Sequence, residues 1–354
     1  MLAYVVRRLA LMLPTIFGIL FLTFLIMQYA PGGPVEQIIS KIQEASSGGP
    51  GGESGAAMSS GSRYRGSEGL DPAFKREIEK QFGFDKPPAE RFLKLLGDYG
   101  RFDFGRSFFS KVPVLDLVRQ KMPVSISLGL WMTLISYLVS IPLGIRKAVS
   151  DGSTFDVATS FFVSIGFAIP AFLWGVLLAT LFCGAYFPIF PLRGLTSENF
   201  AQLSLMGKIG DYLWHIAMPV TALTLGSFAT ITALTKNSFL DEINKAYVQT
   251  ARMKGLTPNR VLYGHVFRNA MMIVIAGFPG AFVSAFFTGA LVIEIIFSLD
   301  GLGRLSYDAV IARDYPIVFA NIYIFALFGL VVNLISDLTY TWVDPRIDFE
   351  RRDV

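Results

Sequence analysis

The chain has 354 residues, of which 53% are hydrophobic and only 16% are charged. Because soluble domains carry about 25% charged residues, this composition excludes a soluble globular protein and indicates an integral membrane protein. The formal net charge of +4 comes from loops that flank apolar segments, where the positive-inside rule accounts for it, so it is no evidence of nucleic-acid binding. The one cysteine, Cys183, lies in an apolar run and excludes an intrachain disulfide.

Six apolar segments reach the length of about 20 residues that a helix needs to cross a bilayer. They are residues 9–29, 124–145, 157–186, 212–235, 270–297 and 317–341. The first follows Arg7 and Arg8, but its apolar run is longer than the roughly 7–15 residues of a signal peptide. We therefore interpret it as a retained anchor.

Basic residues in the short loops predict the orientation of these segments. They are Arg7 and Arg8, Arg146 and Lys147, six Lys/Arg between 236 and 268, and Arg346, Arg351 and Arg352. If six segments alternate, all four groups fall on one side, which is then the cytoplasm. Both termini are predicted to be cytoplasmic, and residues 31–123 form a large loop on the outside.

The outer loop has two parts. Residues 46–69 are rich in glycine and serine and are typical of a flexible linker. After them, the pattern predicts a short helix over 71–83 and a second one that carries Phe92, Leu95, Leu96 and Tyr99 on its apolar side. These helices predict a small external subdomain.

Glycine and proline recur within the apolar segments, where they suit either close packing or broken helices that line a pathway. The run Gly277-Phe278-Pro279-Gly280 favours a bend in the fifth segment. Two acids, Glu294 and Asp337, lie near predicted helix ends, where a paired structural role is favoured over a functional one. His215, beside Trp214, is interpreted as an interfacial residue rather than a ligand.

One polar stretch, residues 237–270, interrupts the apolar segments. Tyr247, Val248 and Ala251 share one helical face, which predicts a short helix with one side packed against another surface. Gly255 is placed to end this helix, and Thr257-Pro258 is placed to begin the next one. A helix–turn–helix between two membrane segments is suited to passing movement to them.

Motifs of bond-making chemistry are absent from the sequence. It has no G-x-x-x-x-G-K-[ST] phosphate loop and no G-x-S-x-G elbow. His215 and His265 are too far apart for H-E-x-x-H, and a single cysteine cannot build a thiolate zinc site. We therefore expect no catalytic residue, no metal site and no ATP binding in this chain.

Residues 249–255, QTARMKG, resemble the EAA loop of permeases of ATP-binding-cassette importers. That pattern is Glu-Ala-Ala, three residues and Gly; Ala251 and Gly255 keep it, whereas Gln249 and Thr250 depart from it. Further motifs resemble the dipeptide/oligopeptide permeases along nearly the whole chain. They are APGGP at 30–34, FDFGRS at 102–107, PVSISLGLW at 123–131, SIPLGIRKAVSDG at 140–152, FAIPAFL at 167–173, FPLRGL at 190–195, FSLDGLGRL at 297–305, RDYP at 313–316 and YTWVDPRIDFE at 340–350. With the glycine-rich insertion, they are similar to the first permease subunit of the Yej-type branch.

The resemblance implies an all-α membrane protein with the six-helix fold of type I ABC importer permeases, located in a bacterial inner membrane. The expected domains are the first helix (1–30), a periplasmic loop subdomain (31–123), the permease core (124–341) with a coupling helix at about 245–256, and a cytoplasmic tail (342–354). Expected partners are a second permease subunit in a heterodimer, an ATPase with two nucleotide-binding domains, a periplasmic peptide-binding protein and membrane lipid. ATP and Mg²⁺ belong to the ATPase, and this chain is expected to hold no cofactor. Oligopeptides and microcin C, a peptide-nucleotide, are the implied cargo.

The resemblance also assigns candidate site residues. The coupling candidates are Tyr247, Val248, Gln249, Thr250, Ala251, Arg252, Lys254 and Gly255. Of these, Val248 and Ala251 are expected to be buried against the ATPase, with Gln249, Thr250 and Arg252 as polar contacts. Phe278, Ser284 and Phe287 are candidates for lining the path of the cargo.

Other functions stay open at this point. An ion- or proton-coupled secondary peptide carrier is the main alternative, although no ladder of buried acids supports it. A membrane-embedded enzyme, a structural scaffold, and a merely solvated basic loop at 237–270 are the others.

Overall fold

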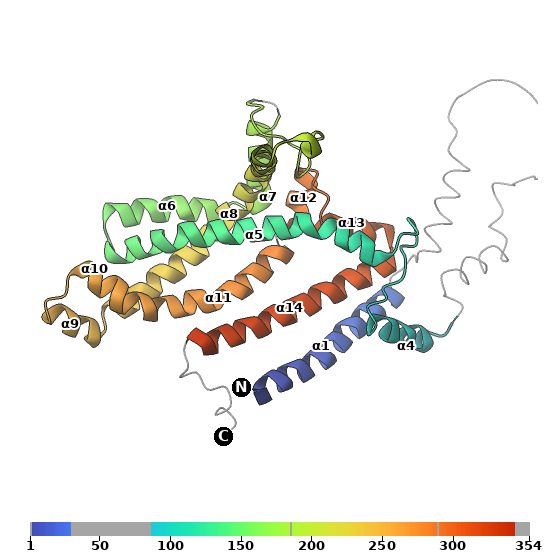
Figure 1. Cartoon of the computed structure of the whole chain (residues 1–354), viewed down its shortest axis with the longest axis horizontal. Helices are drawn as coiled ribbons and strands as arrows, with labels where there is room; N and C mark the ends of the chain where they lie inside the picture. Colours follow the sequence, from blue (N-terminus) through green and yellow to red (C-terminus); the bar gives the residue numbers. More distant parts are fainter. Residues whose placement is uncertain (1, 30–85, 185, 289, 344–354) are drawn as a thin grey trace, which may run out of the picture. The chain divides into compact units, whose positions relative to one another are not determined.

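The computed structural model describes residues 2–29, 86–184, 186–288 and 290–343 (Figure 1). Its main helices are α1 Leu2–Tyr29, α4 Pro88–Tyr99, α5 Val114–Val149, α6 Thr154–Ala168, α7 Ala171–Phe182, α8 Leu205–Ile243, α9 Ala246–Met253, α10 Pro258–Val261, α11 Phe267–Thr288, α12 Ala290–Ile296, α13 Leu302–Ala312 and α14 Tyr315–Val343. The linker 46–69, the predicted helix 71–83 and most of the tail 342–354 lie outside the described residues. The predicted domain boundaries stay predictions.

Within the described ranges, five helical stretches are long and apolar enough to cross a membrane, and a sixth exists if α6 and α7 together count as one span. This confirms the all-α, six-span prediction. The third segment is not straight, however, because α6 and α7 meet at an angle of 94°. Ile169 is extended at the break, with φ −90° and ψ 120°, as expected for a residue before a proline.

Helix α11 continues through Pro279, so the run Gly277–Gly280 does not break the fifth segment, and the bend expected there stays a prediction. A proline inside a membrane helix is tolerated where neighbouring groups satisfy the freed carbonyl. Closer to the start of this span, residues Leu262–Val266 form a π-helical turn between α10 and α11. The irregular backbone of the fifth segment therefore lies at its beginning rather than in its middle.

The chain divides into two compact units. The smaller unit comprises residues 13–118 and 306–324. In it, α4 packs on α1 through the ring of Phe92, whose centroid lies 5.3 Å from that of Phe24. The predicted apolar side of α4 is confirmed, since Phe92 and Tyr99 are buried. In the same unit Asp314 accepts hydrogen bonds from the Ser107 hydroxyl and the Phe108 amide, which joins two of the sequence motifs.

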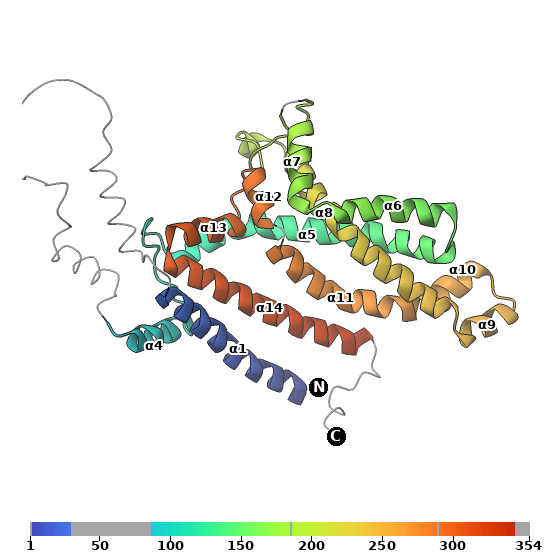
Figure 2. The same cartoon turned by 180° about the vertical axis from the view of Figure 1, so that it is seen from behind.

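The larger unit comprises residues 1–12, 119–305 and 325–354 and is arranged around α8, which packs against α6, α7 and α11 (Figure 2). Close crossings depend on glycine: a Cβ on Gly166 of α6 would lie 2.9 Å from the Leu225 carbonyl oxygen, and one on Gly144 of α5 would lie 2.7 Å from the Thr235 Cβ. Small residues at helix crossings are typical of membrane proteins.

Two apolar cores lie along α8. The first joins α5, α7, α8 and α12 around buried residues such as Leu128, Leu223 and Phe297. The second joins the end of α5, the end of α8, α9, α10 and the start of α11. Cys183 packs against the first core, in agreement with its position in an apolar run.

Both intramembrane acids are paired, as expected for a structural role. Glu294 is fully buried and accepts hydrogen bonds from the Ser125 hydroxyl at 2.7 Å and the Arg304 amide at 2.7 Å. Asp337 on α14 forms an ion pair of 2.8 Å with Arg8 of α1 and accepts a hydrogen bond of 2.8 Å from the Tyr4 hydroxyl.

Candidate functional site

Helix α9 is the element that the sequence predicted as a coupling helix. It begins after Lys245 and ends at Met253, with Lys254 as its C-cap. Gly255 has φ +79°, a left-handed conformation that a residue with a Cβ adopts only with strain, and it lets the chain reverse. Pro258 then begins α10 after an extended Thr257. The predicted stop and start signals are therefore confirmed, although the Thr257 hydroxyl makes no capping hydrogen bond.

The two faces of α9 have different surroundings. Val248 is 0% exposed and Ala251 is 7% exposed, and both belong to the second core together with Phe239 and Val261. The expectation that Val248 and Ala251 are buried against another protein is wrong, because their own chain already covers them. Helical periodicity identified the apolar face correctly, but what covers that face depends on α5, α8 and α11.

The opposite face of α9 is open. Its exposed side chains are Gln249, Thr250, Arg252, Met253 and Lys254. Met253 is 80% exposed, which is unusual for a large apolar residue beside charged ones. This face is the part of the predicted coupling segment that is available to a partner.

Tyr247 fixes α9 to both neighbouring helices. Its hydroxyl donates a 2.7 Å hydrogen bond to the Glu242 carboxylate of α8 and accepts one of 3.2 Å from the Asn269 amide of α11. Glu242 also pairs with Lys245. Burial raises the pKa of the Tyr247 phenol, and the hydrogen bond to Glu242 raises it further, so the phenol stays protonated at neutral pH. A displacement of α9 therefore acts on the ends of α8 and α11.

A cavity of about 390 Å³ lies beside α9, between the end of α5 and α10. Arg252 and Asn259 supply polar groups to a lining that is otherwise mostly apolar, and Val248 forms part of its floor. The packing of α9 against α5 and α10 therefore leaves an internal void next to Val248 and Arg252.

A second cavity, of about 490 Å³, lies where the α6–α7 bend meets α5 and α8. Its lining residues are Met132, Thr133, Ser136, Tyr137, Phe167, Ile169, Pro170, Ala171, Leu223, Gly226, Ser227, Thr230, Ile231 and Ala281. Phe278 adjoins it, because its ring packs edge-on against Tyr137 with the centroids 5.0 Å apart. Ser284 and Phe287 lie on the α11 backbone, but their side chains fall outside the described residues.

The sequence did not identify the α6–α7 bend as part of this cavity. The motif FAIPAFL at 167–173 contained the signal, because Pro170 follows a β-branched residue that readily adopts an extended conformation. Four of the cavity's lining residues come from this motif: Phe167, Ile169, Pro170 and Ala171.

Residues 140–349 match a family described as "Binding-protein-dependent transport system inner membrane component". The matched part includes α9, the whole lining of the cavity beside it, and the lining of the second cavity apart from its residues between 132 and 137. The chain belongs to this family.

Curated relatives are similar over the full length. The "Peptidoglycan transport system permease protein YejB" of Agrobacterium fabrum is 62% identical, with 99% of this chain and 100% of the relative aligned. The "Inner membrane ABC transporter permease protein YejB" of Escherichia coli O157:H7 is 56% identical over the same shares. The "Oligopeptide transport system permease protein AppB" of Bacillus subtilis is 33% identical, again with 99% and 100% aligned.

Membership of this family confirms that the chain is a multi-pass inner-membrane permease of a binding-protein-dependent transport system. It is the membrane component of that system rather than its catalytic component, as the sequence predicted. Such a system includes an ATPase and a solute-binding protein, so partners of these two kinds follow from the family.

Proposed function

We propose that this chain is one of two permease subunits of an ATP-driven importer, and that α9 receives the movement of the ATPase. The geometry of α9 supports this most directly: one face is anchored in the chain's own core, and the other is exposed. Tyr247, Val248 and Ala251 act as the anchor, while Gln249, Thr250, Arg252 and Lys254 contact the ATPase and Gly255 sets the turn. ATP and Mg²⁺ are held by two nucleotide-binding domains of that partner.

The charge around α9 suits an acidic partner surface. Residues 244–269 carry Lys245, Arg252, Lys254, Arg260 and Arg268 and no acidic residue. Met253 projects from the same face, so a partner groove with an apolar socket and an acidic rim fits it. Anionic lipid is the competing source of negative charge.

The proposed orientation places α9 in the cytoplasm with both termini. Two observations support it. The end of α5, with Ile145 and Ala148, packs in the same core as α9, so two of the basic loops lie at one end of the unit. The N-terminal turns of α1 and the last turns of α14 are joined through Arg8 and Asp337, so the described chain starts and ends on one side.

The proposed cargo is an oligopeptide, delivered by a periplasmic peptide-binding protein, with microcin C-like peptide-nucleotides as a finer possibility. The largely apolar cavity at the α6–α7 bend and the ring of Phe278 form this subunit's share of the path, with Ser284 and Phe287 as further candidates. Fragments of peptidoglycan are a second candidate cargo, because a relative of 62% identity is named for peptidoglycan transport. Both cargo classes contain peptide. An uptake assay in which an unlabelled peptidoglycan fragment competes with a labelled oligopeptide, and the reverse pair, shows which of the two the complex prefers.

The turn at Gly255 provides a test of this function. A valine there is strained at φ +79° although no atom lies within 4 Å of its Cβ, so Gly255→Val alters the turn without a clash. In vesicles containing the complete complex, we expect ATP-dependent peptide uptake to be lost and hydrolysis no longer to respond to loaded binding protein. Gly210→Val is the matched control, since its Cβ also meets no atom and its φ is not positive. Normal coupled hydrolysis in the Gly255 variant contradicts the proposal.

A secondary carrier makes a different prediction. It requires uptake by this chain alone, without ATP, under an ion gradient. If vesicles that contain this chain but lack the ATPase show such uptake, the chain is a secondary carrier and the proposed importer function is wrong.

A further inference from the structure

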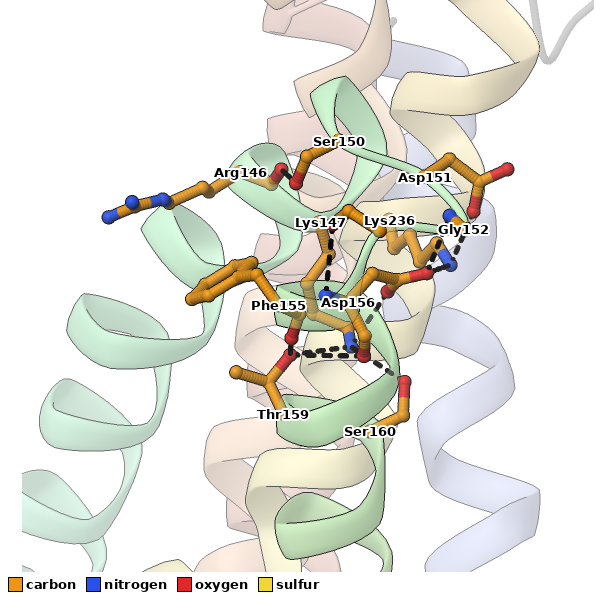
Figure 3. Close-up of polar contacts among 11 residues, drawn as sticks. Arg146, Lys147, Ser150, Asp151, Gly152, Phe155, Asp156, Thr159, Ser160 and Lys236 are labelled. Carbon is orange, nitrogen blue, oxygen red and sulfur yellow. Dashed lines mark hydrogen bonds and ion pairs between the residues drawn. The ribbon is translucent and has the colours of Figure 1, made fainter.

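Four charged side chains join the end of α5, the start of α6 and the C-terminal half of α8 in the larger unit (Figure 3). Lys147 lies in the last turn of α5, Asp151 in the turn before α6, Asp156 in the first turn of α6, and Lys236 on α8. With two lysines and two aspartates, the cluster has a formal net charge of zero. The side chains of Lys147 and Asp156 are only 4% and 7% exposed, whereas those of Lys236 and Asp151 are 19% and 54% exposed, so the cluster has a buried centre and an exposed edge.

Asp156 is the centre of the cluster. Its Oδ1 lies 2.9 Å from Lys147 Nζ, and its Oδ2 lies 2.7 Å from Lys236 Nζ. Oδ2 also accepts a 3.1 Å hydrogen bond from the Gly152 amide, and the Asp156 amide donates to the Ser153 hydroxyl, which caps α6. One carboxylate therefore closes the α5–α6 turn and binds the two neighbouring helices.

The two lysines have separate tasks. Lys147 donates to the Asp156 carbonyl at 2.8 Å, to Thr159 at 3.0 Å and to Ser160 at 2.7 Å, so it ties α5 to the first turns of α6. Lys236 ties α8 to α6 through Asp156 and to the turn through Asp151, each at 2.7 Å. Removal of the Lys236 contacts therefore leaves Asp156 paired with Lys147.

The position of Lys236 gives the cluster a role. It lies on α8 between residues that line the cavity at the bend, such as Ile231, and the helix end at Ile243 that meets α9. At 1.5 Å per residue, Lys236 is about 10 Å from that end. Helix α6 starts at the cluster and its other end, at Phe167, lines the same cavity.

We propose that Lys236 is a positioning residue that makes α6 move together with α8, so that a displacement of α9 reaches two walls of the cavity as one rigid body. The inference rests on the proposed coupling at α9 and extends it to a specific tie. Two packed helices joined by paired charges at one end, and by the close Gly166 crossing further along, have the contacts that a rigid-body movement requires. The competing view is that the cluster only stabilises the α5–α6 turn.

Lys236→Met is the variant that separates the two views, because Asp156 keeps Lys147 and the Gly152 amide. Lys236→Arg keeps the charge and is the rescue variant. Lys208→Met makes the same substitution near the other end of α8 and is the matched control. In vesicles with the complete complex, the loss of both Lys236 ion pairs should lower peptide uptake per ATP hydrolysed about tenfold or more in Lys236→Met. We expect uptake per ATP to be near normal in Lys236→Arg and Lys208→Met.

A distance measurement tests the tie without transport. In a Cys183→Ser background, spin labels at the exposed positions Val157 on α6 and Asn237 on α8 report their separation with and without a trapped ATP analogue. The wild type should show one distance in both states, and Lys236→Met should show a nucleotide-dependent or broadened one. An unchanged distance with normal uptake per ATP in Lys236→Met overturns the proposal. Failure of ATP-driven uptake in the wild type instead contradicts the proposed function, and the distance still decides whether the tie exists.

Discussion

The two ends of α8 are held by different kinds of contact. Near its start, Trp214 stacks on Phe190 with the ring centroids 4.2 Å apart, and Tyr212 accepts a 2.9 Å hydrogen bond from Trp131. His215 is buried there, with Nδ1 2.8 Å from the Asp211 carbonyl oxygen, and its place at the membrane interface stays a prediction. Rings and buried polar contacts of this kind hold a helix end in one place.

The other end of α8 combines an apolar core with ion pairs and hydrogen bonds. Phe239 is fully buried in the second core, with its ring centroid 6.0 Å from that of Phe267. Lys236 pairs with two aspartates, Glu242 pairs with Lys245, and Tyr247 bridges to α11. Polar contacts can exchange partners without opening an apolar core, whereas close-packed rings cannot shift without loss of contact. With the coupling proposed for α9, we expect the start of α8 to be its fixed end and the end near α9 to be its moving end. Changes at the fixed end should lower stability, and changes at the other end should lower uptake per ATP.

The largest loss of stability is expected from Glu294→Ala, in the core at the fixed end. It removes the acceptor of the Ser125 hydroxyl and the Arg304 amide, and we expect a loss of roughly 3 kcal/mol because buried donors are left unsatisfied. Thermal unfolding of the purified complex measures it. Glu294→Gln keeps the shape and one acceptor oxygen, so its loss should be smaller. Equal stability of the alanine variant and the wild type contradicts this view.

A moderate loss is expected from Trp214→Leu. It removes the stack on Phe190, which contributes on the order of 1 kcal/mol beyond its buried area. The thermal midpoint should fall, while uptake per ATP in the surviving complex should equal that of the wild type. A reduced uptake per ATP at normal stability contradicts the division of α8 into two ends.

The smallest effect on stability is expected from Tyr247→Phe at the moving end. The variant loses the hydrogen bonds to Glu242 and Asn269, which costs about 1 kcal/mol or less, but the apolar ring stays in place. Here uptake per ATP should decrease although the complex remains folded. Tyr263→Phe, which removes the hydroxyl of an exposed tyrosine on the π-helical turn, serves as the control and should behave as the wild type.

Local signals predicted α9 well and its surroundings poorly. Gly255 and Thr257-Pro258 encode their backbone conformations within a few residues, so the turn could be read from the sequence. The cover over Val248 and Ala251 could not, because it comes from Ile145 and Val274 on distant segments. For the same reason Lys147 was identified only as an orienting charge, although it is buried against α6. The break at Pro170 and the continuous helix at Pro279 differ through tertiary packing, which a proline alone does not specify.

Crosslinking from α9 to the ATPase tests the central claim most directly. In a Cys183→Ser background, Met253→Cys places a thiol on the exposed face and Val248→Cys places one on the buried face of the same helix. In the intact complex, we predict that Met253→Cys crosslinks to the ATPase with a yield that changes when ATP is bound, and that Val248→Cys does not crosslink. Crosslinking to the ATPase from Leu93→Cys on α4 instead, with none from Met253→Cys, contradicts both the role of α9 and the orientation proposed for it.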